Sequence, residues 1–115
     1  TPDGTCIRDY IQVRDIANAH VLALQKLIEN KHFQNHNIIN LGTGKGVSVL
    51  EAVKAFEKVS GRKLNYVIGD RRSGDVEAIY ANNQKAQQLL GWKPIYDIDE
   101  MMLSAWKWEQ HLCSK

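Results

Sequence analysis

The residues whose types and spacing could carry chemistry are concentrated in one short segment, Arg71-Arg72-Ser73-Gly74-Asp75. Adjacent guanidinium groups can hold a phosphate through paired hydrogen bonds, whereas a lysine offers only a point charge. The carboxylate of Asp75 could accept hydrogen bonds from paired ribose hydroxyls. A solvated charged loop explains the spacing equally well. This segment alone therefore does not decide between a nucleotide site and an ordinary surface loop.

A second cluster, Arg8-Asp9-Tyr10, could complement the first. Arg8 and Asp9 could instead form a surface ion pair, which would contribute little to stability. Taken together, the two clusters provide two arginine sites, a hydrogen-bond acceptor and an aromatic ring. This combination suits a nucleotide diphosphate ligand.

The glycine-rich segment Gly42-Thr43-Gly44-Lys45-Gly46 invites comparison with phosphate-binding loops, because it follows an apolar stretch and precedes a helical pattern. The dinucleotide-binding fingerprint needs its third glycine where this chain has Val47. The P-loop needs Ser or Thr after its Gly-Lys pair, and this chain has Gly46 there. We therefore predict a structural turn.

The histidines and cysteines show no catalytic or metal-binding pattern. His20 lies on the apolar side of a helical pattern, which predicts a packed core histidine. Cys6 precedes Arg8, yet no histidine is placed by the sequence to activate it as a nucleophile. The remaining histidines, His32, His36 and His111, lack metal-ligand spacing. The three tryptophans, Trp92, Trp106 and Trp108, are predicted to be core aromatics.

The elements that must position these side chains follow from the apolar pattern. Alternation predicts a short strand over residues 10–13. Apolar residues at three- and four-residue intervals predict a helix over residues 16–28, with Asp15 placed to cap it or to oppose its dipole. Residues 29–37 are expected to form a polar loop. A buried strand over residues 37–41 then leads into the glycine turn.

Local capping signals mark three more helices. Ser48 and Glu51 form a capping-box pattern, and Gly61 is well placed to end the helix that they begin. A third strand is predicted over residues 64–68, followed by the charged loop. Asn82 or Asn83 is expected to cap a short helix that Gly91 ends. The Asp97 and Glu100 spacing predicts the start of the last helix.

Composition limits the class of protein. The 115 residues are 43% hydrophobic and carry a net charge of +2, which fits one domain with a real core. Helices and strands alternate, so the predicted class is α/β. The near-neutral charge gives no support for a dedicated nucleic-acid binder. No apolar stretch approaches the roughly 18 residues of a membrane span, and no signal-peptide pattern is present. Cys6 and Cys113 are too few for a disulfide framework, which favours a reduced, cytoplasmic setting.

The order and spacing of these segments resemble the UDP-glucose 4-epimerase (UDP-galactose 4-epimerase) family. The similarity starts with residues 1–11 and continues through Asp15 and Ala19-His20. Further along the chain it is carried by Asn40-Leu41-Gly42-Thr43-Gly44, Ser48-Val49-Leu50-Glu51, Arg71-Arg72-Ser73-Gly74-Asp75, Tyr80-Ala81, Leu90-Gly91-Trp92 and Ala105-Trp106-Lys107-Trp108. Gln12 departs from the histidine common in this stretch of the family, which we interpret as a packing change.

This resemblance implies a part of an extended short-chain dehydrogenase/reductase. In that family an N-terminal Rossmann domain holds NAD, and a smaller C-terminal α/β domain holds the UDP-sugar. We therefore expect residues 1–115 to be the C-terminal UDP-sugar-binding domain of a longer enzyme, an expectation that fits a chain beginning with Thr1. The family's Tyr-x-x-x-Lys pair is absent, because Tyr10, Tyr66, Tyr80 and Tyr96 are followed four positions later by Arg14, Asp70, Gln84 and Glu100. NAD would accordingly be bound outside this segment.

The resemblance also implies roles for individual residues. Arg8 and Arg72 match the two arginines that contact the UDP diphosphate, and Asp75 matches the carboxylate that holds the ribose hydroxyls. The neighbouring residues expected to bind substrate are Cys6, Ile7, Tyr10, Ser73 and Gly74. No catalytic, cofactor-binding or metal-binding residue is expected within the chain.

The implied activity is the interconversion of UDP-glucose and UDP-galactose through a 4-keto intermediate, with a homodimer as the usual assembly. Two alternatives stay open. The full-length protein could epimerise UDP-arabinose and UDP-xylose or N-acetylated hexosamines, or the chain could be a nucleotide-binding or partner-binding module without catalysis.

Overall fold

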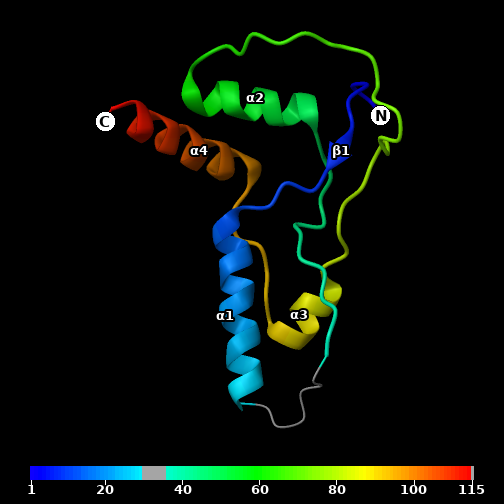
Figure 1. The fold of residues 1–115 in the computed structure, drawn as a ribbon, viewed down its shortest axis with the longest axis vertical. Coiled ribbons are helices and arrows are strands. Elements are labelled where there is room, and N and C mark those ends of the chain that lie inside the picture. The colour runs from blue at the N-terminus through cyan, green and yellow to red at the C-terminus, as the bar shows by residue number, and fades with distance from the viewer. Residues whose placement is uncertain (30–35, 115) are drawn as a thin grey trace.

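The structure is a computed structural model that describes residues 1–29 and 36–114. Its elements, in chain order, are β1 (Ile7–Arg8), α1 (Val13–Glu29), β2 (Val47–Ser48), α2 (Val49–Ser60), α3 (Gln84–Leu90) and α4 (Ile98–Cys113). Helices α2 and α4 pack together at one end of the molecule, and α1 and α3 pack together at the other (Figure 1). Strand β1 lies beside the start of α2, and extended segments pass from this end of the molecule to the α1 and α3 pair (Figure 1).

The core of the α1 and α3 pair surrounds Trp92, which is fully buried. Ala19 of α1 and Ala86 of α3 are buried against it, because their small side chains let the helices approach closely. The indole Nε1 of Trp92 donates a hydrogen bond of 2.8 Å to the carbonyl oxygen of Asp15. The prediction that Trp92 is a core aromatic is therefore confirmed.

Helix α2 begins and ends as the sequence predicts. The Ser48 hydroxyl accepts a hydrogen bond from the Glu51 amide, and the Glu51 carboxylate accepts one from the Ser48 amide, so the capping box is complete. Gly61 ends the helix with a φ of 69°, in the left-handed region. Buried Ala52 and Ala55 are on this helix, and the Phe56 ring meets Trp106 of α4 edge-on, with 5.6 Å between ring centroids.

The other two helix boundaries predicted from capping signals are also present. Asn83 precedes α3, the Asn82 side chain accepts from the Gln84 amide, and Gly91 ends the helix in the left-handed region with a φ of 66°. At the start of α4, the Asp97 side chain accepts a hydrogen bond of 2.8 Å from the Glu100 amide. These signals are local, since donor and acceptor lie within four residues of each other.

The predicted strands are wrong in place and extent. Residues 10–13 are no strand, because the Gln12 side chain caps α1 by accepting from the Arg14 amide at 2.9 Å, and Val13 already belongs to the helix. Residues 37–41 and 64–68 are extended without strand pairing. The described pairing is instead antiparallel between β1 and β2, with a parallel bridge from Ile7 to Ala78. A strand requires a partner, and these partners lie far away along the chain.

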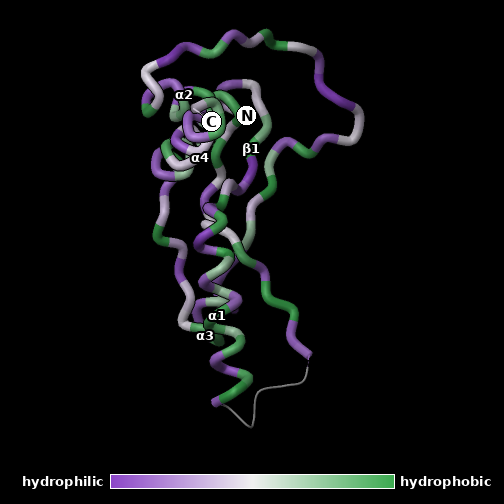
Figure 2. Tube along the Cα trace, turned by 60° about the vertical axis from the view of Figure 1, so that its left-hand side comes forward, coloured by the Kyte–Doolittle hydropathy of each residue, from purple (hydrophilic) through white to green (hydrophobic). Residues whose placement is uncertain are grey.

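Several predicted core residues are exposed. His20 faces solvent, and Trp108 is 58% exposed, so both core predictions are wrong; the Trp108 ring stacks on His111 at the surface. Leu24, Leu27 and Ile28 are also more than half exposed along α1, where hydrophobic and hydrophilic residues alternate (Figure 2). Within the described residues, the surface of α1 that carries them is left uncovered.

Two further predictions concern the polar loop over residues 29–37 and the absence of a membrane span. Residues 30–35, which include His32 and most of the expected polar loop over residues 29–37, lie outside the described residues. Among the helices that are described, none combines the length and the apolar character needed to cross a membrane.

Candidate functional site

The charged loop brings Arg72 and Asp75 together through a tight turn. The Asp75 amide donates to the Arg72 carbonyl oxygen at 3.3 Å. Gly74, the third residue of the turn, has a φ of 83°, which side chains other than hydrogen rarely allow and which type II turns require. The Arg72 Nε and Nη2 atoms each lie 3.0 Å from the Oδ2 atom of Asp75. Ser73 and Gly74 thus serve the geometry of the turn.

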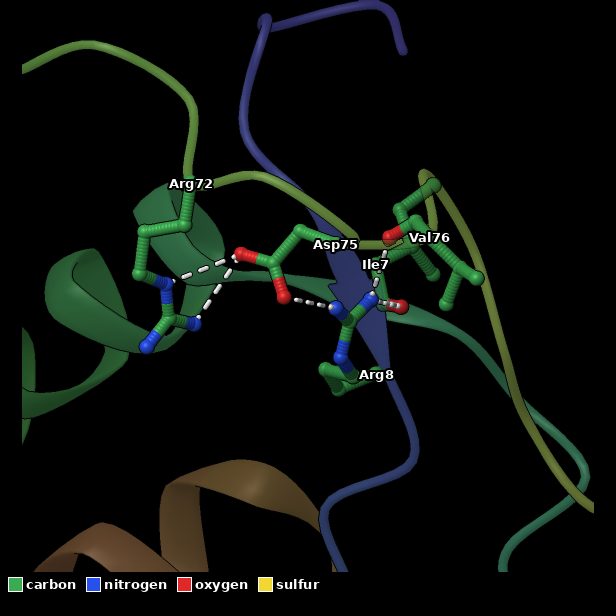
Figure 3. A network of polar contacts seen from close by, with 5 residues as sticks. All are labelled: Ile7, Arg8, Arg72, Asp75 and Val76. Atoms are coloured by element: carbon green, nitrogen blue, oxygen red, sulfur yellow. Dashed lines mark hydrogen bonds and ion pairs between the residues drawn. The ribbon is translucent and has the colours of Figure 1, made fainter.

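Arg8 approaches the same carboxylate from strand β1. Its Nη2 atom lies 3.4 Å from the Oδ1 atom of Asp75, and its Nη1 atom donates to the carbonyl oxygens of Ile7 and Val76 at 2.8 and 2.9 Å. Figure 3 shows the two guanidinium groups on opposite oxygens of one carboxylate. The side chains of Arg8 and Asp75 are 29% and 25% exposed, whereas that of Arg72 is 84% exposed. Arg8 is therefore the more constrained arginine, and Arg72, although paired with Asp75, is the more exposed one.

Backbone hydrogen bonds hold the segments that carry these residues side by side. The Ile7 amide donates to the Glu77 carbonyl oxygen at 2.8 Å, and the Ile79 amide donates to the Ile7 carbonyl oxygen at 3.1 Å. On the other side, the Val49 amide at the start of α2 donates to the Cys6 carbonyl oxygen at 3.1 Å. Residues 6–8 are thus held between the segment that follows Asp75 and the N-terminus of α2.

The pockets of the surface divide the predicted site residues. Cys6, Arg72 and Asp75 line one pocket of about 340 Å³ beside the start of α2. Tyr10 lines a separate pocket of about 370 Å³, together with Thr43 and Tyr96. Arg8 lines a third pocket of about 490 Å³, together with Asp9 and Tyr80. The ion pairs bring Arg8, Arg72 and Asp75 together, with Cys6 in the pocket of Arg72 and Asp75, whereas Tyr10 lies in another pocket.

The arrangement suits an anion with two charged groups. Two guanidinium groups face one carboxylate, so this trio carries a net charge of +1. Each guanidinium has five N–H donors, and Asp75 takes up only part of them. A carboxylate offers about four lone-pair sites; Asp75 accepts one hydrogen bond from Arg8 and one from Arg72, and the Arg72 Nη2 atom forms an ion pair with the same oxygen as the second. The site can thus donate to phosphate oxygens and still accept from a hydroxyl.

Asp9, which the sequence suggested as an ion-pair partner of Arg8, has other partners in the structure. It does not pair with Arg8. Its carboxylate accepts from the Thr43 amide and hydroxyl at 2.9 and 2.7 Å, from the Gly44 amide at 3.2 Å and from the Ala81 amide at 3.1 Å. Burial would raise the pKa of Asp9, but these hydrogen bonds outweigh it and hold the pKa below its ordinary value. The only indication of this role in the sequence was the glycine-rich segment Gly42–Gly46, whose backbone amides need a hydrogen-bond acceptor.

These bonds confirm that the Gly42–Gly46 segment is a structural turn. Amides that could otherwise cradle a phosphate donate to Asp9. A Cβ atom at Gly46 would overlap with the Ile7 side chain, which shows that this glycine is needed for close packing. The turn therefore does not fit the diphosphate of NAD. Over residues 1–29 and 36–114, no group of three or more His, Cys, Asp or Glu side chains could hold a metal ion.

The comparisons with known proteins point in one direction. A family model described as GDP-mannose 4,6 dehydratase matches residues 2–104. The UDP-glucose 4-epimerase GEPI48 of Cyamopsis tetragonoloba is 52% identical over 94% of this chain, which is 30% of that protein. These matches confirm the resemblance that the sequence motifs indicate.

Solved structures extend the likeness to the fold. A UDP-glucose 4-epimerase from Stenotrophomonas maltophila, with bound NAD and formylated UDP-arabinopyranose, is 44% identical with a TM-score of 0.90, over 99% of this chain and 33% of that one. The enzyme from Bifidobacterium longum, in complex with NAD+ and UDP, is 44% identical with a TM-score of 0.84, over 96% and 32%.

These structures confirm the predicted fold class, with few strands in the part that the structure describes. The chain spans about a third of the length of the solved chains and 30% of the curated relative that it matches.

Proposed function

The chain belongs to the family described as GDP-mannose 4,6 dehydratase, and on this premise we propose that it supplies the UDP-binding face of a UDP-glucose 4-epimerase. The observation that carries the proposal is the convergence of Arg8 and Arg72 on Asp75. The similarity to UDP-glucose 4-epimerases, one of them in complex with UDP, supports it. The full-length enzyme interconverts UDP-glucose and UDP-galactose through a 4-keto sugar, and bound NAD would supply the hydride chemistry that this change of oxidation state requires.

In this proposal, the chain's own residues bind and orient the nucleotide. Arg8 is already fixed by two carbonyl oxygens and presents a preorganised positive charge to the diphosphate. Arg72, being largely exposed, turns from Asp75 toward the phosphates and completes the clamp. The hydrogen-bonding capacity that Asp75 regains accepts the ribose hydroxyls. Binding energy from the nucleotide thus positions a sugar that the clamp itself does not grip, which leaves the sugar free to rotate.

The test is the affinity of the full-length protein for UDP after Arg72→Ala. Charge-assisted hydrogen bonds contribute about 1.5–3 kcal/mol each, so we expect UDP affinity to fall roughly 10- to 100-fold. Isothermal titration calorimetry measures this directly. Arg72→Lys should recover little, because an ammonium cannot donate the same pair of bonds.

Arg62→Ala is the matched control. Arg62 is also an exposed arginine, but it lies past the C-terminal end of α2, with its guanidinium 5.3 Å from the centre of the Trp106 ring. Its removal should leave UDP affinity unchanged. Equal UDP affinities for Arg72→Ala and the unsubstituted protein would contradict the proposal.

We further propose that residues 1–115 form the UDP-sugar-binding domain of a longer enzyme, at its C-terminal end, and that NAD is bound by the part outside this chain. No tyrosine of the chain is followed by lysine four positions later. The amides of the glycine turn donate to Asp9 and leave no cradle for a dinucleotide phosphate. The share of the relatives' length that the chain spans agrees with this division.

A second candidate is epimerisation of a different UDP-sugar. The similar Stenotrophomonas maltophila structure contains formylated UDP-arabinopyranose, and a similar structure from Campylobacter jejuni is described as a UDP-Glc/GlcNAc 4-epimerase, so pentose and N-acetylated hexosamine substrates belong in the comparison. Turnover of the full-length protein on UDP-galactose, UDP-arabinose and UDP-N-acetylgalactosamine would rank them. UDP binding without turnover of any sugar would favour a module without catalysis.

We also propose a cellular compartment and an oligomeric state for the full-length protein. Both cysteines, Cys6 and Cys113, are free thiols, which fits the reducing cytoplasm. We expect the full-length enzyme to be a homodimer, and sedimentation equilibrium would measure its mass.

A further inference from the structure

Asp9 connects three parts of the chain that are distant in sequence. Its Oδ1 atom accepts from the amide and hydroxyl of Thr43, and its Oδ2 atom accepts from the amides of Gly44 and Ala81. Asp9 directly follows Arg8, and Ala81 lies six residues after Asp75. One carboxylate therefore joins the segment that carries Arg8 to the segment that carries Asp75.

The bond to Ala81 continues the pairing of these two segments. Residues 7 and 77–79 are already joined by two backbone hydrogen bonds, and the Asp9 side chain acts as acceptor where the backbone pairing stops. Without the bond from the Ala81 amide to Asp9, residues 77–81 would be hydrogen-bonded to the segment that carries Arg8 through residues 77 and 79 alone. Arg8 and Asp75, with 3.4 Å between the Nη2 and Oδ1 atoms, lie on the two segments that these bonds align.

Gly42 shows that the surroundings are shaped around this carboxylate. A Cβ atom at Gly42 would overlap with the Asp9 Oδ2 atom and would lie 2.7 Å from the Ala81 Cβ atom. Glycine is thus the residue that lets the 42–44 turn, Asp9 and Ala81 meet. The close approach is specific to this point, since a Cβ atom at Gly69 would meet nothing within 4 Å.

We propose that Asp9 is a positioning residue for the nucleotide clamp, which it aligns by fixing the Arg8 segment, the Gly42–Gly44 turn and the 75–81 segment to one another. Asp9 does not touch the nucleotide and acts through Arg8 and Asp75. The inference rests on the proposed function, because it assigns Asp9 a role in the same UDP site.

The decisive experiment measures UDP affinity of the full-length protein carrying Asp9→Asn. An asparagine presents an NH₂ group where a carboxylate oxygen accepted amide donors, so the alignment is lost. We expect UDP affinity to fall roughly tenfold, a size typical of coupled neighbours in one network. Coulomb attraction alone predicts the opposite, since removing a negative charge near a diphosphate strengthens its binding.

Asp15→Asn is the matched control for a general loss of stability. Asp15 is a buried carboxylate that also accepts from two backbone amides, those of Ile95 and Tyr96, but it does not bond to the clamp segments. Both variants should lower the melting temperature, whereas only Asp9→Asn should weaken UDP binding. Equal UDP affinities for the two folded variants would overturn the inference.

Two further variants keep the inference testable if Asp9→Asn does not fold. Thr43→Val removes the hydroxyl bond to Asp9 and should weaken UDP binding about two- to threefold; unchanged affinity would count against the inference. In a background of Arg8→Ala, Thr43→Val should have a smaller effect than in the unsubstituted protein, because Arg8 is one of the two residues through which Asp9 acts.

The outcomes separate the two proposals. If Arg72→Ala leaves UDP affinity unchanged, the proposed function fails. If Arg72→Ala weakens binding and neither Asp9→Asn nor Thr43→Val does, only the role of Asp9 fails.

Discussion

Individual carboxylate side chains in this molecule accept hydrogen bonds from segments that are distant in sequence. Asp3 is one of them. Its Oδ1 atom accepts from the amide and hydroxyl of Thr5 at 2.9 and 2.8 Å, and its Oδ2 atom accepts from the hydroxyl of Ser48. Ser48 is also the N-cap of α2. The N-terminal turn is thereby fastened to the helix that borders the Cys6, Arg72 and Asp75 pocket.

This arrangement predicts a pH-dependent contribution of Asp3 to stability. The hydrogen bond from Ser48, followed by those from Thr5, lowers the pKa of Asp3 from 3.8 to about 2. A carboxyl whose pKa is lowered by folding stabilises the folded state above its unfolded pKa and loses that effect as the pH falls through its folded pKa. Asp3→Asn should therefore lower the melting temperature at neutral pH, and the difference should shrink between pH 3.8 and about 2.

Thermal unfolding monitored by circular dichroism at several pH values measures this difference. Asp70→Asn provides the control, because Asp70 is an exposed carboxylate of the charged loop. A melting-temperature difference for Asp3→Asn that is constant over the whole pH range would show that the charge of Asp3 is not what stabilises the turn.

Residues of this kind mark the limit of what the sequence could predict about the site. The turn from Arg72 to Asp75 is local, so its arginine and carboxylate could be paired from spacing. Arg8 is 67 residues from Asp75, and only the chemistry of a diphosphate ligand and the family resemblance associated them. Asp9, Gln12 and Asp15 have roles set by backbone amides or side chains far along the chain, for which spacing contains no signal.

At the scale of elements, the helix ends make a prediction about glycine. Gly61 ends α2 with a φ of 69°, and a Cβ atom there would meet nothing within 4 Å. The cost of Gly61→Ala is therefore backbone strain alone, partly offset by the lower entropy of the unfolded chain, or roughly 1 kcal/mol of the free energy of unfolding.

Gly69→Ala separates this strain from other effects of adding a methyl group. Gly69 has equally open surroundings and no positive φ, so its substitution should change the free energy of unfolding by less than about 0.5 kcal/mol. Denaturant unfolding of both variants under the same conditions gives the comparison. A larger loss of stability for Gly69→Ala than for Gly61→Ala would refute the assignment of the cost to the left-handed conformation.

Helices were easier to predict here than strands, because helix capping depends on residues close in sequence and strand pairing depends on distant ones. Ser48, Glu51 and Gly61 act within a few residues of one another, and the capping geometry follows from the local sequence. Strand β1 exists because residues 47–48 and Ala78 pair with it. The apolar patterns at residues 10–13, where they alternate, and at residues 64–68 gave no information about such partners, and the strands predicted there are absent.

At the scale of the whole molecule, the arrangement of the helix pairs explains what the chain can and cannot do. The Arg72 and Asp75 pocket is lined on one side by residues of α2, and strand β1, which carries Arg8, lies beside the start of that helix (Figure 1). Helix α1 leaves Leu24, Leu27 and Ile28 exposed. The described residues thus form the proposed UDP-binding face, while one apolar helix face is without cover among them.

This division predicts that the 115-residue chain alone does not interconvert UDP-glucose and UDP-galactose, even with NAD added. Its four tyrosines are followed at the fourth position by Arg14, Asp70, Gln84 and Glu100, so no lysine is placed to assist a tyrosine in proton transfer. The amides of its glycine turn donate to Asp9. The assay would follow formation of UDP-glucose from UDP-galactose, with circular dichroism to establish that the chain is folded and the full-length enzyme as positive control. We expect the folded chain to bind UDP without turnover, because the clamp lies within residues 8–75. Turnover above the buffer blank without a second polypeptide would contradict this prediction and would show that the chain contains catalytic groups of its own.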